Sequence, residues 1–120
     1  LLARRALAVG EVAVTALGER LPEALLLQSP ELTAELVRRR LGPLLELPDA
    51  EGRLLLDTLD AWVRTAGSAA RTAAEVHCHR NTVINRLRRI ETLTGHAASE
   101  TIPLDLALAL RAWRVLRSAG

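Results

Sequence analysis

The stretch that decides the fold is Ser68–Gly95, SAARTAAEVHCHRNTVINRLRRIETLTG. It contains an alanine-rich segment and a later segment of arginine and aliphatic residues, and both compositions favour helix. Ser68 is predicted to cap a first helix from Ala69 to about Val76, and a second helix is predicted from Arg80 to about Leu93, closed by Gly95. The residues His77-Cys78-His79 leave room only for a tight turn, so the spacing predicts a helix-turn-helix.

The second helix of this motif divides into two faces on a helical wheel. The aliphatic face, which is expected to pack on the preceding helices, consists of Val83, Leu87 and Ile90, with Thr94 behind them. The opposite face consists of Asn81, Asn85 and Arg88, with Thr82 and Arg89 beside them. Asparagine pairs with adenine and arginine with guanine in the major groove, so this second face predicts recognition of double-stranded DNA.

Asn81 and Asn85 are therefore the candidate base-reading residues. Arg80 and Thr82, at the start of the helix, are candidates for contact with either bases or phosphates. His77 occupies a turn position at which the backbone often takes positive φ, and histidine is among the residues that tolerate this conformation.

Phosphate contacts are expected at both ends of the motif. Ser68 and Arg71 begin the first helix, where the helix dipole favours an anion, and Arg88 and Arg89 lie toward the far end of the second helix. Between Ser68 and Gly95 the sequence has five arginines and two acidic residues, Glu75 and Glu91, so the local charge is +3. Arg86 flanks the aliphatic face, and an ion pair with Glu75 or Glu91 is an equal alternative for it.

The composition of all 120 residues fits an all-α protein. Nearly half of the chain is apolar, yet Trp62 and Trp113 are its only aromatic residues, so the core must be aliphatic. No strand alternation and no hairpin turn signal is present. Residues 64–120 carry nine arginines and four acidic residues, whereas residues 1–63 carry seven arginines and ten acidic residues, which suggests that only the second half meets a polyanion.

The motif resembles the C-terminal helix-turn-helix domain of PucR-type regulators, and it is also similar to the Fis-type helix-turn-helix. The matching runs are Leu55-Leu56-Asp57-Thr58-Leu59, Ala73-Ala74, His79-Arg80-Asn81-Thr82-Val83 and Arg86-Leu87-Arg88-Arg89-Ile90. The resemblance implies a bacterial transcription regulator whose effector is bound by domains upstream of this chain. Two positions depart from the family pattern: Asn85, where the family often has an aromatic residue, and the turn pair His77-Cys78.

The N-terminal part is predicted to be a helical arm, and the resemblance likens it to the tail of an upstream regulatory region. Residues 1–18 are expected to be helical, and a bend is expected at Pro22. A helix is predicted to begin with Ser29 as cap and Pro30 as its first residue, and to stop at Gly42-Pro43.

The next helix is predicted to open at Pro48-Asp49, with Asp49 as its cap, and to end at Gly67. Its apolar face is expected to consist of Leu55, Leu59, Trp62 and Val63. The chain is therefore expected to divide into an arm, residues 1–47, and a DNA-binding domain, residues 48–120.

The last helix, which Pro103 begins, has two apolar sides. Leu104, Leu108 and Val115 lie on one side, and Leu106, Leu110 and Trp113 lie on the other. We predict a homodimer through this helix, the N-terminal arm or both, which would cover the second side and suit a two-fold symmetric DNA site. The alternative is that residues 1–40 cover it within one chain.

Other chemistries receive little support from the sequence. His77, Cys78 and His79 alternate in a tight turn and point apart, so we expect no metal site, and no catalytic or cofactor motif is present. Without a signal peptide or a membrane-spanning run, the chain is interpreted as cytoplasmic. The alternative function is a helical protein–protein interaction module that does not bind DNA, and the polar face of the second helix argues against it.

Overall fold

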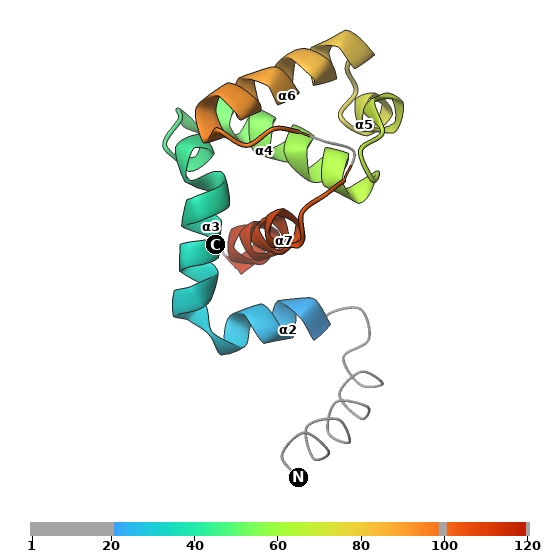
Figure 1. Ribbon diagram of the computed structural model, residues 1–120. Helices are drawn as coiled ribbons and strands as arrows, with labels where there is room; N and C mark the ends of the chain where they lie inside the picture. Colours follow the sequence, from blue (N-terminus) through green and yellow to red (C-terminus); the bar gives the residue numbers. More distant parts are fainter. Residues whose placement is uncertain (1–20, 99–100, 120) are drawn as a thin grey trace.

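The computed structural model describes residues 21–98 and 101–119, and every regular element in these ranges is an α-helix (Figure 1). The helices are α2 (Leu21–Gln28), α3 (Pro30–Leu45), α4 (Asp49–Arg64), α5 (Ala69–Glu75), α6 (Arg80–Thr94) and α7 (Leu104–Ala119). The all-α prediction is thus confirmed. The helix predicted over residues 1–18 lies outside the described residues.

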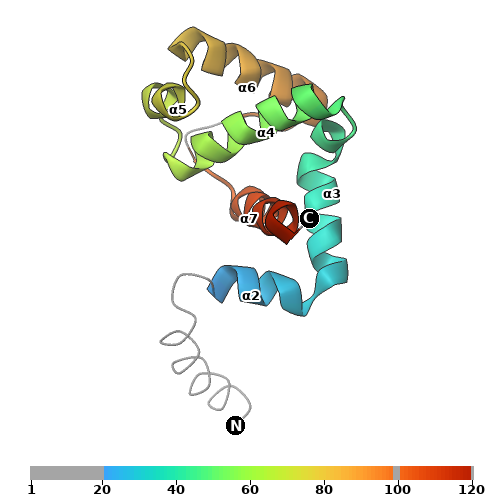
Figure 2. The same ribbon diagram turned by 180° about the vertical axis from the view of Figure 1, so that it is seen from behind.

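The helices form two groups joined by α3. Helices α4, α5 and α6 pack together, with α6 lying over α4 and α5 across one end of the pair (Figure 1). Helix α3 runs from α2 to this unit and contacts α4 and α6. Helix α7 lies between the three-helix unit and α2, as both views show, and it packs mainly on α3 (Figures 1 and 2).

One aliphatic core connects α3 to α7. Its fully buried members include Leu41 and Leu44 of α3, Val83 of α6 and Leu110 of α7. The predicted apolar face of α4 is confirmed, because Leu55, Leu59 and Trp62 are buried and Val63 packs against them. Helix α3 therefore shares its core with the helix-turn-helix, and the division of the chain at residue 47 stays a prediction.

The expected bend at Pro22 is wrong: Pro22 lies in the first turn of α2, where its missing amide hydrogen costs nothing. The stop at Gly42-Pro43 is also wrong, because α3 continues through Pro43 to Leu45. An interior proline costs about 3 kcal/mol. Complete burial of Leu41 and Leu44 on either side of the pair offsets that cost, at roughly 1.5–3 kcal/mol for each leucine.

The ends of two helices differ in detail from the prediction. Ser29 occupies the cap position before Pro30, but its side chain makes no cap hydrogen bond. Asp49 is not the cap of α4, because Pro48 holds that position and Asp49 is the first helical residue, where its charge favours the helix dipole.

Helix α7 is covered within the same chain on the side that faces α2 and α3. Within α7, Leu110 is fully buried, and Ala109 and Ala112 are buried as well. On the second apolar side, Leu108 and Val115 are half-buried, and the choice between a homodimer and coverage by residues 1–40 stays a prediction. Leu104 and Leu116, at its two ends, remain exposed.

Candidate nucleic-acid interface

The turn between α5 and α6 has the geometry of a helix-turn-helix. Ser68 caps α5, and its Oγ accepts a hydrogen bond from the Arg71 amide at 3.1 Å. After α5 the chain reverses at His77, which has a φ of 53°, and the Cys78 amide donates to the Ala73 carbonyl at 3.1 Å. The predicted cap and the predicted positive φ at His77 are both confirmed.

Helix α6 begins with a cap that the sequence pattern did not reveal. The Nδ1 atom of His79 accepts a hydrogen bond from the Asn81 amide at 3.1 Å. This bond satisfies one of the amides that a helix start leaves without a partner. Histidine is not a frequent cap residue, so residue type alone gave no signal. The helix ends, as predicted, at Gly95, which has a φ of 72°.

Hydrogen bonds of two threonine hydroxyls hold the segment between α4 and α5 in place. Thr72 is fully buried, and its Oγ1 donates to the Ser68 carbonyl at 2.7 Å. The same oxygen lies 3.0 Å from Thr65 Oγ1, just beyond the end of α4. These bonds hold the start of α5 against α4, and Ala66 and Gly67, with φ of 55° and 80°, turn the chain between them. Helix α4 therefore ends at Arg64, before the predicted stop at Gly67.

The two faces of α6 are arranged as predicted. Val83, Leu87 and Ile90 are buried against the other helices. Asn81 and Asn85 are exposed, and neither side chain makes a hydrogen bond to another described residue. Their amide groups are therefore available to an external partner along the outer face of the helix.

The arginines separate into two sets by their partners. Most of the described arginines are bound to acidic or hydroxyl groups of the protein; an example is Arg64, which contacts both Asp60 and Glu75. Among the described residues, the guanidinium groups that make no such contact belong to Arg53, Arg71, Arg80 and Arg88. Three of these four, all exposed, lie on α5 and α6 within the predicted DNA-contact set. Most of the unpaired arginines among the described residues thus lie on the helix-turn-helix.

Two other arginines of α6 point toward α4. Arg89 contacts Glu51, with Nε and Nη2 at 2.7 and 2.6 Å from one carboxylate oxygen. The alternative ion pair of Arg86 with Glu75 or Glu91 does not form, and its Nη1 instead donates to Thr58 Oγ1 at 3.1 Å. The sequence missed Thr58 because its contact with α6 depends on how α4 and α6 cross.

The remaining candidates, Ser68 and Thr82, lie at the starts of α5 and α6. No group of three or more His, Cys, Asp or Glu side chains in residues 21–98 and 101–119 is arranged to hold a metal ion. None of the helices in these ranges combines the length and apolar character needed to cross a bilayer.

Comparison with known proteins agrees with this geometry. Residues 55–112, which run from α4 into α7, match the family model of the PucR C-terminal helix-turn-helix domain. An uncharacterized protein in the pkwA 5′ region of Thermomonospora curvata is 43% identical over 74 residues, which is 62% of this chain and 40% of that protein. The chain thus spans less than half the length of this relative. No solved structure matches the chain.

The family match and the observed fold point in the same direction. The matched range contains the capped α5, the turn at His77 and the whole of α6. A domain of this kind indicates a DNA-binding regulator. Residues 55–112 are thus similar to the PucR C-terminal helix-turn-helix domain.

Proposed function

We propose that this domain binds double-stranded DNA in a sequence-specific manner, with α6 in the major groove. The observation that carries the proposal is that three unpaired guanidinium groups and two unbonded asparagine side chains are exposed on α5 and α6 of the helix-turn-helix.

Asn81 and Asn85 read base edges in this proposal, because a primary amide can bond bidentately to adenine. Arg80 and Thr82, at the start of α6, contact bases or the adjacent phosphates. Arg88 lies one turn beyond Asn85 on the same face and neutralises a phosphate.

The start of α5 binds the DNA backbone. Ser68 already accepts the Arg71 amide, and its hydroxyl hydrogen is still able to donate to a phosphate oxygen. The guanidinium of Arg71 adds a positive charge at the same place. Arg89 is shared between Glu51 and DNA, so its contribution is smaller than that of Arg88.

We further propose that the chain acts in transcription control in the bacterial cytoplasm and that the functional form is a homodimer, since a two-fold symmetric site would bind two copies. The dimer contact is proposed at α7, at the N-terminal arm or at both, where Leu25, Leu27, Leu32, Leu104 and Leu116 are exposed. A small-molecule effector would bind to parts of the parent protein outside this chain.

The experiment is a fluorescence anisotropy titration of a labelled DNA duplex at several salt concentrations, with matched arginine variants. Arg88→Ala is expected to weaken binding and to reduce the salt slope by about one. Arg53→Ala is the control, because Arg53 is equally exposed and unpaired among the described residues but lies on α4. It removes the same charge, and we expect it to leave the slope nearly unchanged.

Equal effects of the two substitutions would contradict the proposed face, since binding would then follow net charge alone. Absence of salt-dependent binding by the folded protein would favour the interaction module instead. The proposed dimer is tested separately by sedimentation, and a monomer mass at high protein concentration would reject it.

A further inference from the structure

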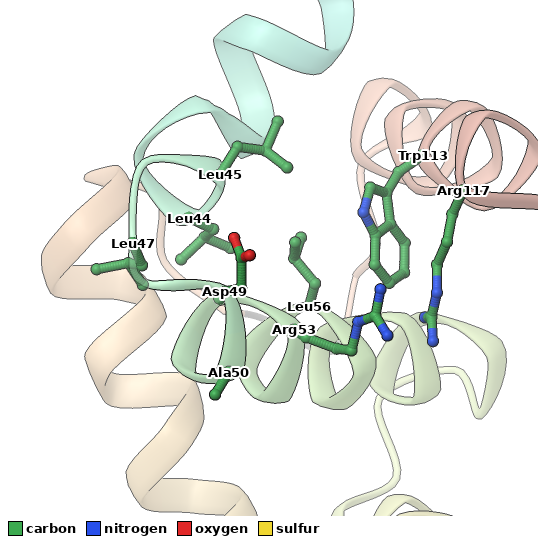
Figure 3. Close-up of a pocket in the computed structure, with 10 residues that line it drawn as sticks. Leu44, Leu45, Leu47, Asp49, Ala50, Arg53, Leu56, Trp113 and Arg117 are labelled. Carbon is green, nitrogen blue, oxygen red and sulfur yellow. The ribbon is translucent and has the colours of Figure 1, made fainter. Parts of the chain in front are cut away.

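A hollow of about 500 Å³ lies on the side of α4 where α3 and α7 meet it (Figure 3). Its volume falls within the range of small-molecule sites, roughly 300–1,000 Å³. Leu45 and Leu47, from the end of α3 and the following turn, form one accessible wall, while Leu44 and the central Leu56 also line the hollow but are almost completely buried. None of the residues that line it belongs to α5 or α6.

The end of the hollow next to α7 combines positive charge with an aromatic ring. Arg117 lies over the Trp113 indole, 5.1 Å from the ring centroid, and contacts Asp57 Oδ1 at 2.8 Å. Arg53 extends from α4 toward the same indole (Figure 3). Among the described residues, Arg53 is the one arginine outside the helix-turn-helix whose guanidinium has no partner.

The opposite end of the hollow carries negative charge. Asp49, in the first turn of α4, lies beside Leu44 and Leu45 (Figure 3). Asp49 and Arg53 are one helical turn apart, yet they form no ion pair. The two ends of the hollow therefore carry opposite charges. An anion is favoured only at the end that Arg53 and Trp113 form.

We propose that this hollow binds a small amphipathic carboxylate, a molecule with one carboxylate group and a flat apolar body. The carboxylate pairs with Arg53, whose planar guanidinium can donate two parallel hydrogen bonds. The apolar body packs on the Trp113 ring and on the leucine wall. Arg117 supports the site by holding the indole in place, while its own charge is largely balanced by Asp57.

This site is separate from the proposed DNA face and does not depend on it. Its ligand would contact α3, α4 and α7 together and would bridge the helix-turn-helix unit to the remainder of the fold. DNA binding and carboxylate binding can consequently succeed or fail independently.

The test uses the two tryptophan indole N–H signals in a two-dimensional NMR spectrum of the 120-residue chain, without DNA. The probe is 4-phenylbutyrate, and its neutral counterpart is 4-phenylbutan-1-ol. The indole signal that is lost in Trp113→Phe identifies Trp113. We expect phenylbutyrate to shift the Trp113 signal saturably, with little effect on the buried Trp62, and the alcohol to bind about tenfold more weakly.

Arg53→Gln is expected to weaken phenylbutyrate binding by about tenfold, while Arg53→Lys, which keeps the charge but not the planar fork, loses less. Arg71→Gln removes the same charge from the DNA face and is expected to leave phenylbutyrate binding unchanged. The proposal is overturned if the Trp113 signal does not respond, if the acid and the alcohol act equally, or if Arg53→Gln binds as well as the wild type.

Discussion

The ion pair between Glu51 and Arg89 sets how much positive charge the far end of α6 presents to a phosphate. Both side chains are partly exposed, at 37% and 51%, so the pair is weakly held and open to competition. Glu51→Gln should free Arg89 and remove a nearby negative charge. We expect duplex affinity to rise by roughly two- to fivefold, since an exposed pair contributes up to about 1 kcal/mol.

The matched control is Glu46→Gln, which removes the same charge from an exposed glutamate at the end of α3 that contacts no described arginine. Anisotropy titrations of both variants decide the matter. A gain that is equal in the two variants would show that net charge, and not release of Arg89, is responsible.

The His79 cap has a measurable effect on stability. His79→Ala leaves the Asn81 amide without its partner, and we expect the free energy of unfolding to fall by about 1 kcal/mol. His79→Asn supplies another cap acceptor and should recover most of the loss. Urea denaturation measures both, and equal losses in the two variants would argue against the cap.

At the scale of elements, the corner between α3 and α4 depends on Gly52. Gly52 is buried, and a Cβ built on it would lie 2.8 Å from the Leu44 carbonyl oxygen, a backbone atom that cannot move aside. We expect Gly52→Ala to reduce the free energy of unfolding by about 1–3 kcal/mol, as overpacking does.

Gly42→Ala is the matched substitution in the neighbouring helix. Its added Cβ would meet only Arg38 Cγ, at 3.9 Å, so alanine should stabilise α3 by up to about 1 kcal/mol through its helix propensity. Thermal unfolding of the two variants should therefore change in opposite directions. A loss of stability in both would mean that the helix around Gly42-Pro43 tolerates no side chain.

The elements that could be predicted from sequence are those with local signals. Ser68, the short turn and Gly95 act on backbone groups within a few residues, and α5 and α6 have the expected bounds to within a residue. The extent of α3 could not be predicted, because it depends on tertiary burial of Leu41 and Leu44, which outweighs the local stop signal of Gly42-Pro43.

The candidate site was predictable only as a list of residue types. The wheel separates Asn81, Asn85 and Arg88 from the core, and the structure agrees. A helical wheel does not show which arginines find partners on other helices. The sequence therefore predicted phosphate contacts for Arg88 and Arg89 alike. The contact between Arg89 and Glu51 spans 38 residues and follows from how α4 and α6 cross.

At the scale of the whole molecule, ion pairs join α7 to the elements around it. Arg40 of α3 binds both carboxylate oxygens of Asp105, at 2.8 and 2.9 Å. The Arg40 side chain is only 11% exposed, and its hydrogen bonds hold the pKa of Asp105 below the ordinary range. A pKa lowered by folding contributes stability above the ordinary pKa, and this contribution is lost as the pH falls through the lowered value.

Asp105→Asn should therefore lower Tm at neutral pH, by an amount equivalent to about 1 kcal/mol, and the difference from wild type should shrink below about pH 4. Glu46→Gln again serves as control and should show no such dependence. A difference that stays constant down to pH 3 would mean that the asparagine acts through packing, and not through the lost charge.

The outer face of α6 is proposed to read DNA sequence, and the decisive measurement is selection from a random duplex library. The wild-type chain and the double variant Asn81→Ala, Asn85→Ala would be carried through parallel selections. We predict that the wild type enriches a short site, and that the variant loses this enrichment while it keeps salt-dependent binding to unselected duplex. Enrichment of the same site by both proteins, or of no site by the folded wild type, would contradict the claim.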